Sequence, residues 1–207
     1  MGITPPVRAI VLAAGSSARL GSPKALLRFD ERTALEIVVA ALGEAGIDAG
    51  AVVVGEHAAE IVEAVDPAPF VWVRNPSPES GRLGSILVGL RALLPGADVL
   101  LWPVDRPLAA IATVRALIAA CADVRPAEGI VVPESDGGRG HPLVLRPPLF
   151  PALLSSPPDA NLRNVIQESG LTRREVPVND PGIHFDLDTK KKYEKALAWW
   201  RRERADA

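Results

Sequence analysis

The first informative stretch of the sequence is LAAGSSARLGSPK, which occupies residues 12–24. It follows the apolar run Val7–Leu12, which predicts a buried strand. The small residues around Gly15 leave room for the backbone to approach a ligand, so that main-chain N–H groups can point at phosphate oxygens. Arg19 and Lys24 add two positive charges beside them. The stretch therefore predicts a phosphate-binding loop at the end of a strand.

The spacing of this loop excludes two better-known phosphate-binding motifs. No Gly-Lys-Ser/Thr closes it, so it is not a Walker A loop, and no G-x-G-x-x-G is present. A Gly/Ser-rich segment with one arginine and one lysine would by itself be an ordinary solvated turn. Its position directly after a buried strand favours a binding loop instead.

Length and composition predict one globular domain over residues 1–207, because 48% hydrophobic residues suffice for one sizeable core. The net charge of −2 gives no reason to expect binding to nucleic acid or to an anionic membrane. No run is long and apolar enough for a membrane span, and residues 1–6 lack a signal-peptide pattern, so we expect a cytoplasmic protein. The one cysteine, Cys121, lies in an apolar helical pattern and is expected to be buried.

Short β-rich runs alternate with helical patterns over the first two-thirds of the chain. The expected strands are 7–12, 51–55, 70–73, 99–105 and 129–133, and the expected helices are 33–46, 58–65, 83–94 and 109–122. Thr33 and Glu36 form the pattern of a capping box at the start of the first helix. Strands that are apolar on both faces and joined by helices predict an α/β fold with a mostly parallel, doubly wound sheet.

The pattern changes after Gly137. The stretch His141–Leu145 predicts a returning, antiparallel strand. Pro-rich turns, a helix near Asn161–Ser169, two short strands and a last helix from about Thr189 are expected to follow. Trp199 and Trp200 are expected to anchor this last helix.

Asp105 is the first candidate metal ligand. Ligands of parallel sheets bind beyond the carboxyl ends of the strands, and both Gly15 and Asp105 follow such ends. A carboxylate at the end of an apolar strand needs a partner, which a metal ion would supply. The alternative is that Asp105 caps the helix that begins at Ala109.

A second acidic site, Phe185–Thr189, precedes the last helix. On an extended strand Asp186 and Asp188 would point to the same side. One of them is then a candidate metal ligand, while the other could cap the helix.

Two glycine-containing stretches are candidate binding elements. Asn75 followed by Gly81–Gly89 predicts a helix N-terminus whose free N–H groups suit the polar atoms of a nucleotide. In Gly138–Pro142, with the sequence GRGHP, the glycines permit close approach and His141 could hydrogen-bond a ligand. The alternative is a hairpin turn with an exposed histidine.

Together these motifs resemble those of the molybdenum-cofactor guanylyl- and cytidylyltransferases, and the resemblance covers nearly the whole chain. The first stretch fits L-A-A-G-x-S-x-R-x-G-x-x-K, Val104–Pro107 is similar to the family's V-D-x-P, and residues 138–142 resemble the G-x-x-G-H-P of the cytidylyltransferase branch. The family's closing motif, D-I-D-T-P-E-D, is matched only in part, since Lys190 stands where the family has proline.

The resemblance implies a three-layer Rossmann-like nucleotidyltransferase fold with a small C-terminal subregion on the substrate side. Residues 1–135 would form the nucleotide-binding half, and residues 136–207 would bind the acceptor and complete the metal site. The implied reaction moves CMP from CTP to the terminal phosphate of molybdopterin, with Mg²⁺ and release of pyrophosphate. A molybdoenzyme that receives the product is an implied partner.

The resemblance also implies a role for each site residue. The catalytic residues would be Lys24, Arg19 and Asp105, and Asp105 would hold the metal with Asp188, or else with Asp186. The implied nucleotide-binding residues are Leu12, Ala13, Ala14, Gly15, Ser17, Gly21, Asn75, Gly84 and Ser85. The acceptor would contact Gly140, His141 and Pro142. Three alternatives stay open: GTP as the donor, a sugar or alcohol phosphate as the acceptor of CTP, and a non-catalytic carrier of the cofactor.

Overall fold

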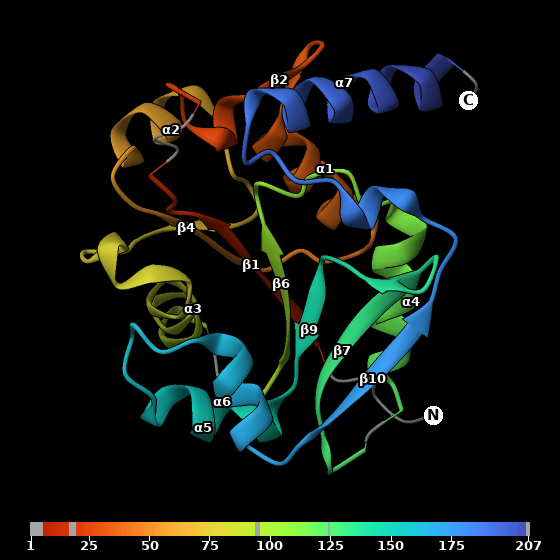
Figure 1. The fold of residues 1–207 in the computed structure, drawn as a ribbon. Coiled ribbons are helices and arrows are strands. Elements are labelled where there is room, and N and C mark those ends of the chain that lie inside the picture. The colour runs from red at the N-terminus through yellow and green to blue at the C-terminus, as the bar shows by residue number, and fades with distance from the viewer. Residues whose placement is uncertain (1–5, 17–19, 94–95, 124, 206–207) are drawn as a thin grey trace.

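Strands from both parts of the chain join one sheet in the computed structural model, which describes residues 6–16, 20–93, 96–123 and 125–205 (Figure 1). The order across the sheet is β10 (Thr172–Pro177), β7 (Glu128–Ser135), β9 (Leu143–Leu145), β6 (Asp98–Pro103), β1 (Val7–Ala13), β4 (Gly50–Val54) and β5 (Val71–Arg74). The pairs β1–β4, β1–β6, β4–β5 and β7–β10 are parallel. Strand β9 runs antiparallel to both of its neighbours, and the short β8 (Gly138–Arg139) pairs antiparallel with β7. The predicted mostly parallel sheet with a returning strand is thereby confirmed.

Helices cover both faces of this sheet and make three layers. Side chains along β1 alternate between two hydrophobic clusters, because successive residues of a strand point to opposite faces. Val11 belongs to the cluster that contains residues of α1 (Ala34–Glu44), α2 (Ala58–Ala64), α4 (Ile111–Cys121) and α7 (Lys190–Ala205). Ile10 belongs to the cluster that contains residues of α3 (Gly81–Ala92), α5 (Phe150–Ser155) and α6 (Leu162–Glu168). Among the described residues, no helix is both long enough and apolar enough to cross a membrane.

Most of the helix and strand predictions are confirmed, with ends that differ by about two residues. The Thr33 hydroxyl accepts from the Glu36 N–H at 3.2 Å, and the Glu36 carboxylate accepts from the Thr33 N–H at 2.6 Å, so the capping box is present. One prediction is wrong: of the two strands expected after α6, only β10 occurs in the described part of the chain. The following segment forms a 3-10 turn, Pro181–His184, because Asp180 accepts from the Gly182 N–H.

Parallel pairing brings the ends of β1 and β6 together. Leu12 lies opposite Pro103, and the Val104 N–H donates to the Leu12 carbonyl at 3.0 Å. The loops that carry Gly15 and Asp105 therefore leave the sheet side by side, as expected for the carboxyl edge of parallel strands.

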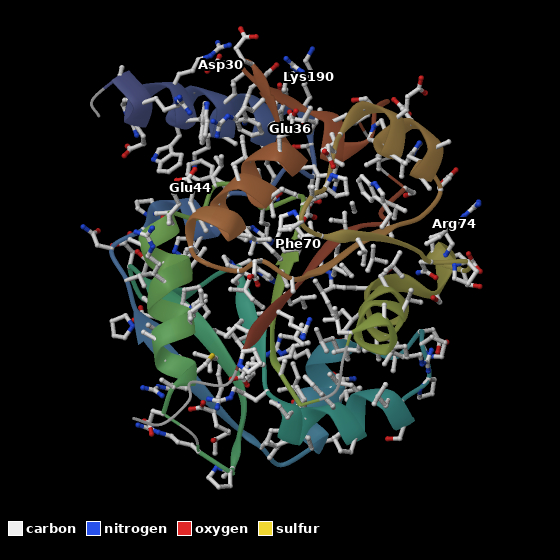
Figure 2. The ribbon with its side chains drawn as sticks, turned by 180° about the vertical axis from the view of Figure 1, so that it is seen from behind. Asp30, Glu36, Glu44, Phe70, Arg74 and Lys190 are labelled. Atoms are coloured by element: carbon white, nitrogen blue, oxygen red, sulfur yellow. The ribbon has the colours of Figure 1, made fainter. Side chains whose placement is uncertain are left out.

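Helix α7 is held against the hairpin of β2 (Arg28–Phe29) and β3 (Arg32–Thr33). The Phe29 ring meets the rings of Tyr193 and Trp200 edge-on, at centroid distances of 5.7 and 5.9 Å. An ion pair of 2.7 Å joins Arg201 to Asp30, which lies beside α7 in Figure 2. These contacts confirm that aromatic residues anchor the last helix, and they fix the position of the acidic segment just before it.

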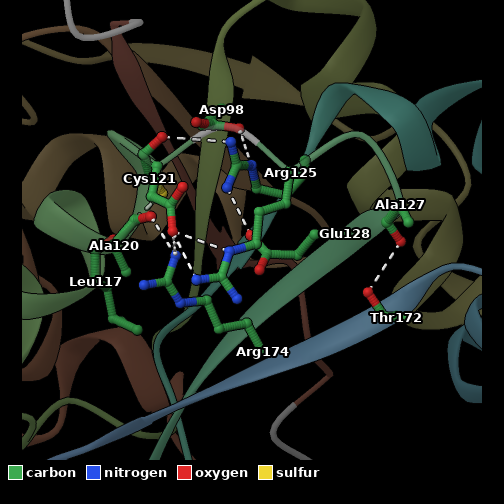
Figure 3. A network of polar contacts seen from close by, with 11 residues as sticks. Asp98, Leu117, Ala120, Cys121, Arg125, Ala127, Glu128, Thr172 and Arg174 are labelled. Atoms are coloured by element: carbon green, nitrogen blue, oxygen red, sulfur yellow. Dashed lines mark hydrogen bonds and ion pairs between the residues drawn. The ribbon is translucent and has the colours of Figure 1, made fainter.

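The opposite end of the sheet holds a buried ionic network, of which Figure 3 labels Asp98, Cys121 and Glu128. Arg146, only 4% exposed, contacts Asp98 at 2.8 Å and Glu128 at 2.6 Å. It also donates to the carbonyl of Cys121, whose thiol is buried as predicted. Burial raises the pKa of Asp98 and raises the pKa of the Cys121 thiol to about 12. The guanidinium of Arg146 thus balances the carboxylates of Asp98 and Glu128, which are the first residues of β6 and β7.

We expect Arg146→Met to lower the free energy of unfolding by about 3–5 kcal/mol, because it leaves two buried carboxylates without their cation. Urea denaturation followed by circular dichroism measures this loss. The matched control is Arg125→Met, which removes an exposed ion pair with Asp123 and should change the midpoint little. Equal midpoints for the two variants would contradict a structural role for the network.

Candidate active site

A cavity of about 200 Å³ opens at the carboxyl ends of β1 and β6. Its walls come from the loop after β1, the 3-10 turn Lys24–Leu26, the end of β6 and the start of α3. The lining residues include Leu12, Ala13, Ala14, Gly15, Lys24, Gly81, Arg82, Ser85 and Asp105. We name it the first cavity.

Lys24 joins two carboxylates at this cavity. Its ammonium contacts Asp105 at 3.5 Å and Asp188 at 2.5 Å, across 81 and 164 positions of sequence. The hydrogen bond from Lys24 is the main reason that the pKa of Asp188 lies below its usual value. Three residues singled out in the sequence therefore lie together in the folded chain.

Asp105 does not cap the helix that follows it. The N-cap residue of α4 is Ala110, whose N–H donates to the Asp180 carboxylate at 2.8 Å, and the Thr113 hydroxyl donates to the same carboxylate at 2.6 Å. Asp105 Oδ1 is instead buried without a hydrogen-bond partner among the described residues. A hydrogen bond of 2.9 Å from the Leu187 N–H to the Asp105 carbonyl ties the two acidic segments together.

The expectation that Asp186 and Asp188 point to one side of a strand is wrong. Residues 185–189 are not a strand; instead the Asp188 N–H donates to the Asp186 carboxylate at 3.2 Å, which turns the chain. Asp186 pairs with Lys192 at 2.8 Å, whereas Asp188 pairs with Lys24. The cap of α7 is Thr189, whose hydroxyl accepts from the Lys192 N–H, so Asp188 is not used as a cap.

The pair Asp105 and Asp188 fits a hard divalent cation. Mg²⁺ usually takes one or two protein carboxylates and completes its octahedron with phosphate oxygens and water. The unpartnered Oδ1 of Asp105 offers such a ligand atom. No group of three or more His, Cys, Asp or Glu side chains suited to a metal occurs in the described ranges, so the substrate would have to supply the remaining ligands.

The predicted nucleotide-binding residues divide into four groups. Residues 12–15 line the first cavity, while Ser17 and the catalytic candidate Arg19 lie outside the described residues. Gly21 has a φ of +71°, which requires glycine at that turn.

The fourth group consists of Asn75, which directly follows β5, and of Gly84 and Ser85 in the first turns of α3. Asn75 is 3% exposed and donates to the Ser85 hydroxyl at 3.1 Å, so that Ser85 faces the cavity and Asn75 supports it from behind. Gly84 does not line this cavity, since it faces Ser80, whose hydroxyl leaves no space for a Cβ.

A second cavity, of about 690 Å³, adjoins the first and shares Gly81 and Arg82 with it. Gly140 and His141 line this second cavity, but Pro142 is not among the residues that do so. A Cβ on Gly140 would lie 2.5 Å from Ile183, so only glycine allows that segment to pass. The cavity also contains four arginines, which are Arg82, Arg139, Arg163 and Arg173.

His141 is not the exposed histidine of a hairpin turn. Burial, with smaller effects from the positive charges of Arg106 and Arg82, lowers its pKa to about 3. Its Nδ1 atom is buried and has no hydrogen-bond partner in the described part of the chain. Burial thus favours the neutral form of His141, and its Nδ1 atom lacks a partner among the described residues.

Sequence reasoning missed Arg82 and Arg106. Arg106 follows Asp105 directly, and its Nε atom is buried without a partner among the described residues. Each arginine lies inside a motif that the sequence analysis quoted for other residues. The positive charge of these two side chains was the signal that could have found them, because a cation beside a strand end or a helix start suits an anionic ligand.

We expect the neutral state of His141 to make folding less favourable in acid. Between pH 6.5 and pH 5 the unfolded chain takes up a proton on this histidine and the folded protein does not, so the free energy of unfolding decreases as the pH falls. The decrease from this group reaches at most about 2 kcal/mol over that range.

Urea denaturation at several pH values measures the effect in the wild type and in His141→Gln, which should lack this part of the decrease. His57→Gln, at the start of α2, is the matched control. An unchanged pH dependence in His141→Gln would refute the prediction.

Comparison with known proteins places the fold in a family. The model of the MobA-like NTP transferase domain matches residues 9–175. Rv0371c from Mycobacterium tuberculosis is 28% identical over 95% of this chain and 100% of its own, with a TM-score of 0.79. Another structure of Rv0371c is a complex with manganese, 26% identical over 93% of this chain and 98% of its own, with a TM-score of 0.76.

Two further structures share the fold at lower identity. A nucleotidyl transferase from Methanothermobacter thermautotrophicus is 24% identical over 96% of this chain and 99% of its own, with a TM-score of 0.81. Molybdopterin-guanine dinucleotide biosynthesis protein A from Archaeoglobus fulgidus is 16% identical over 94% of this chain and 99% of its own, with a TM-score of 0.69. No curated protein matches the sequence. With the family model covering most of its length, the chain belongs to the MobA-like NTP transferases and is a nucleotidyltransferase.

Proposed function

We propose that this protein transfers CMP from CTP to the terminal phosphate of molybdopterin. An oxygen of that phosphate attacks the α-phosphorus of the nucleotide, a new P–O bond forms, and the bond to the β-phosphate breaks. Pyrophosphate leaves, and the product is the cytosine dinucleotide form of the cofactor.

The observation that carries this proposal is the contact of Lys24 with Asp105 and Asp188 beside the loop 12–15. Nucleotidyl transfer needs little covalent catalysis by the protein. The enzyme must mainly neutralise the charge of the phosphates and align the attacking oxygen. A lysine next to a backbone cradle supplies charge for the triphosphate, and two carboxylates supply ligands for a cation. The adjoining second cavity offers space for an acceptor next to the nucleotide.

Each residue then has a distinct task. The backbone of Ala13–Gly15 donates hydrogen bonds to the triphosphate, and Lys24, with Arg19, offsets the charge of the departing pyrophosphate. Ser85, supported by Asn75, faces the nucleotide. Gly140 and His141 line the second cavity, in which the acceptor would bind, and Pro142 holds the chain next to them.

Asp105 and Asp188 are the residues that would hold Mg²⁺. The ion supplies positive charge against the phosphate oxygens of the bound nucleotide. Lys24 contacts both carboxylates in the structure, so a cation held by Asp105 and Asp188 would compete with its ammonium for them.

The choice of CTP rests on the likeness of residues 138–142 to the cytidylyltransferase branch, and the main alternative is GTP with the same acceptor. A sugar or alcohol phosphate is the alternative acceptor for CTP. A cofactor carrier without activity would have no use for Lys24, Asp105 and Asp188 in one place, so this arrangement favours an enzyme.

We expect Lys24→Ala and Asp105→Asn each to lower the turnover rate by about 10²–10³-fold, because each removes a charge that stabilises the transition state. Release of pyrophosphate, measured with purified molybdopterin, Mg²⁺ and each of the four nucleoside triphosphates, tests this. Lys191→Ala, which removes an exposed lysine of α7, is the matched control. No turnover with any nucleotide would exclude the proposed reaction, and a preference for GTP would assign the protein to guanylyl transfer.

We expect Asp188→Asn to raise the concentration of Mg²⁺ or Mn²⁺ needed for half-maximal activity by at least about tenfold, because it removes one charged ligand of the cation. Asp186→Asn removes a carboxylate of the same segment that faces Lys192 instead, so its metal dependence should stay close to that of the wild type. A larger shift for Asp186→Asn than for Asp188→Asn would reverse the assignment.

A further inference from the structure

Residues 180–188 form a segment that contacts loops of both cavities, and we name it the strap. On the side of the first cavity, the Leu187 N–H donates to the Asp105 carbonyl at 2.9 Å. On the side of the second cavity, the Ile183 carbonyl accepts from the His141 N–H at 3.2 Å. Backbone hydrogen bonds of one short segment thus reach a lining residue of each cavity.

The strap also packs closely on the loop between β6 and α4. Gly182 lies against the backbone of Leu108, and a Cβ at Gly182 would collide with the Leu108 carbonyl oxygen. The side chains of Ile183 and Leu187 are fully buried in the hydrophobic cluster that also contains Leu108. The strap and the loop that carries Asp105 therefore pack as one unit.

Asp180, the first residue of the strap, joins it to the start of α4. Its Oδ2 atom accepts from the Ala110 N–H at 2.8 Å and from the Thr113 hydroxyl at 2.6 Å, across 70 and 67 positions of sequence. Its Oδ1 atom accepts from the Gly182 N–H at 2.9 Å, within the strap itself. The Asp180 N–H donates to the Ser135 hydroxyl at 3.3 Å. One carboxylate thus holds two segments that are distant in sequence.

The burial of Asp180 is more than a helix start requires. The residue is 4% exposed, and no cation lies within ion-pair distance of it among the described residues. A buried carboxylate without a cation is costly unless several hydrogen bonds satisfy it, and here three donors do so. A hydroxyl or an amide would suffice to accept from one free N–H of a helix. The two-sided use of the carboxylate is explained by a second task, which is to hold the strap.

We propose that Asp180 is a positioning residue, which holds Asp188 at the place where it can share a cation with Asp105. This inference rests on the proposed function, because that function assigns the cation to these two carboxylates. Asp180 itself contacts neither the cation nor the substrate and acts through the strap. Loss of its carboxylate releases the strap from α4, so that Asp188 is no longer held relative to Asp105.

Hydrogen exchange of single amides, measured by NMR, tests whether Asp180 holds the strap. In Asp180→Asn one oxygen becomes an NH₂ group that cannot accept, so at least one of the hydrogen bonds is lost. We expect the amides of Leu187 and His141 to exchange at least about tenfold faster than in the wild type. The amide of Ala9, which donates to a carbonyl at the other end of the sheet, should keep its rate. An equal acceleration at all three amides would show only a loss of global stability and would overturn the inference.

Binding of Mn²⁺, measured by the EPR signal of the free ion, connects the strap with the metal site without turnover. We expect Asp180→Asn to raise the Kd of Mn²⁺ about tenfold, as is typical for residues that orient metal ligands. Asp188→Asn, which removes the ligand itself, should raise the Kd at least as much. Unchanged affinity in Asp180→Asn, beside weaker binding in Asp188→Asn, would overturn the positioning role. Equal affinity of the wild type and Asp188→Asn would instead refute the metal site of the proposed function, and the exchange rates then decide the role of Asp180.

The matched control is Thr33→Ala, which also removes a side chain that accepts from a backbone N–H at the start of a helix, here α1. It should lower the thermal midpoint but leave the Kd of Mn²⁺ and the relative exchange of the strap amides as in the wild type. The same selective changes in Thr33→Ala would overturn the inference. Thr113→Val, which keeps the carboxylate and removes one of its donors, should change exchange and Mn²⁺ binding in the same direction by a smaller factor, and it serves if Asp180→Asn does not fold.

Discussion

The ammonium of Lys24 is the group on which the arrangement of the site depends. It balances two carboxylates, Asp105 and Asp188, that would repel each other without a cation between them. These three residues come from the end of the first loop, the end of β6 and the segment before α7. The Leu187–Asp105 backbone hydrogen bond and the packing of α7 on Phe29 hold the same segments in place. One charge constraint thereby links the N-terminal, central and C-terminal parts of the chain.

The two ends of the sheet use ionic groups in different ways. At the amino ends of β6 and β7, Arg146 is nearly fully buried with two carboxylates, and the group is closed to ligands. At the carboxyl end of β6, Lys24 and Asp105 line an open cavity, and Lys24 also contacts Asp188. The strands between them are apolar and buried on both faces. The closed network can stabilise the frame, while the open one can change partners when a substrate and a cation bind.

The border between the cavities explains why the chain needs both of its parts. Arg82 comes from the first half of the chain and His141 from the second, and both line the second cavity. The turn at Gly140 passes against Ile183, so the position of His141 also depends on the segment that leads to Asp188. Nucleotide and acceptor would thus meet where elements distant in sequence converge.

The sequence by itself determined the alternation of helices and strands, the loop after β1 and the candidates Lys24 and Asp105, because these follow from local periodicity and from motif spacing. Only the tertiary structure decided between Asp186 and Asp188, since the turn before α7 directs one to Lys192 and the other to Lys24. It also placed the Asp180 carboxylate at the start of α4, and it brought Arg82 and His141 to one cavity. The physical reason is that charge pairing and burial act between residues far apart in the chain, where spacing along the sequence carries no information about distance.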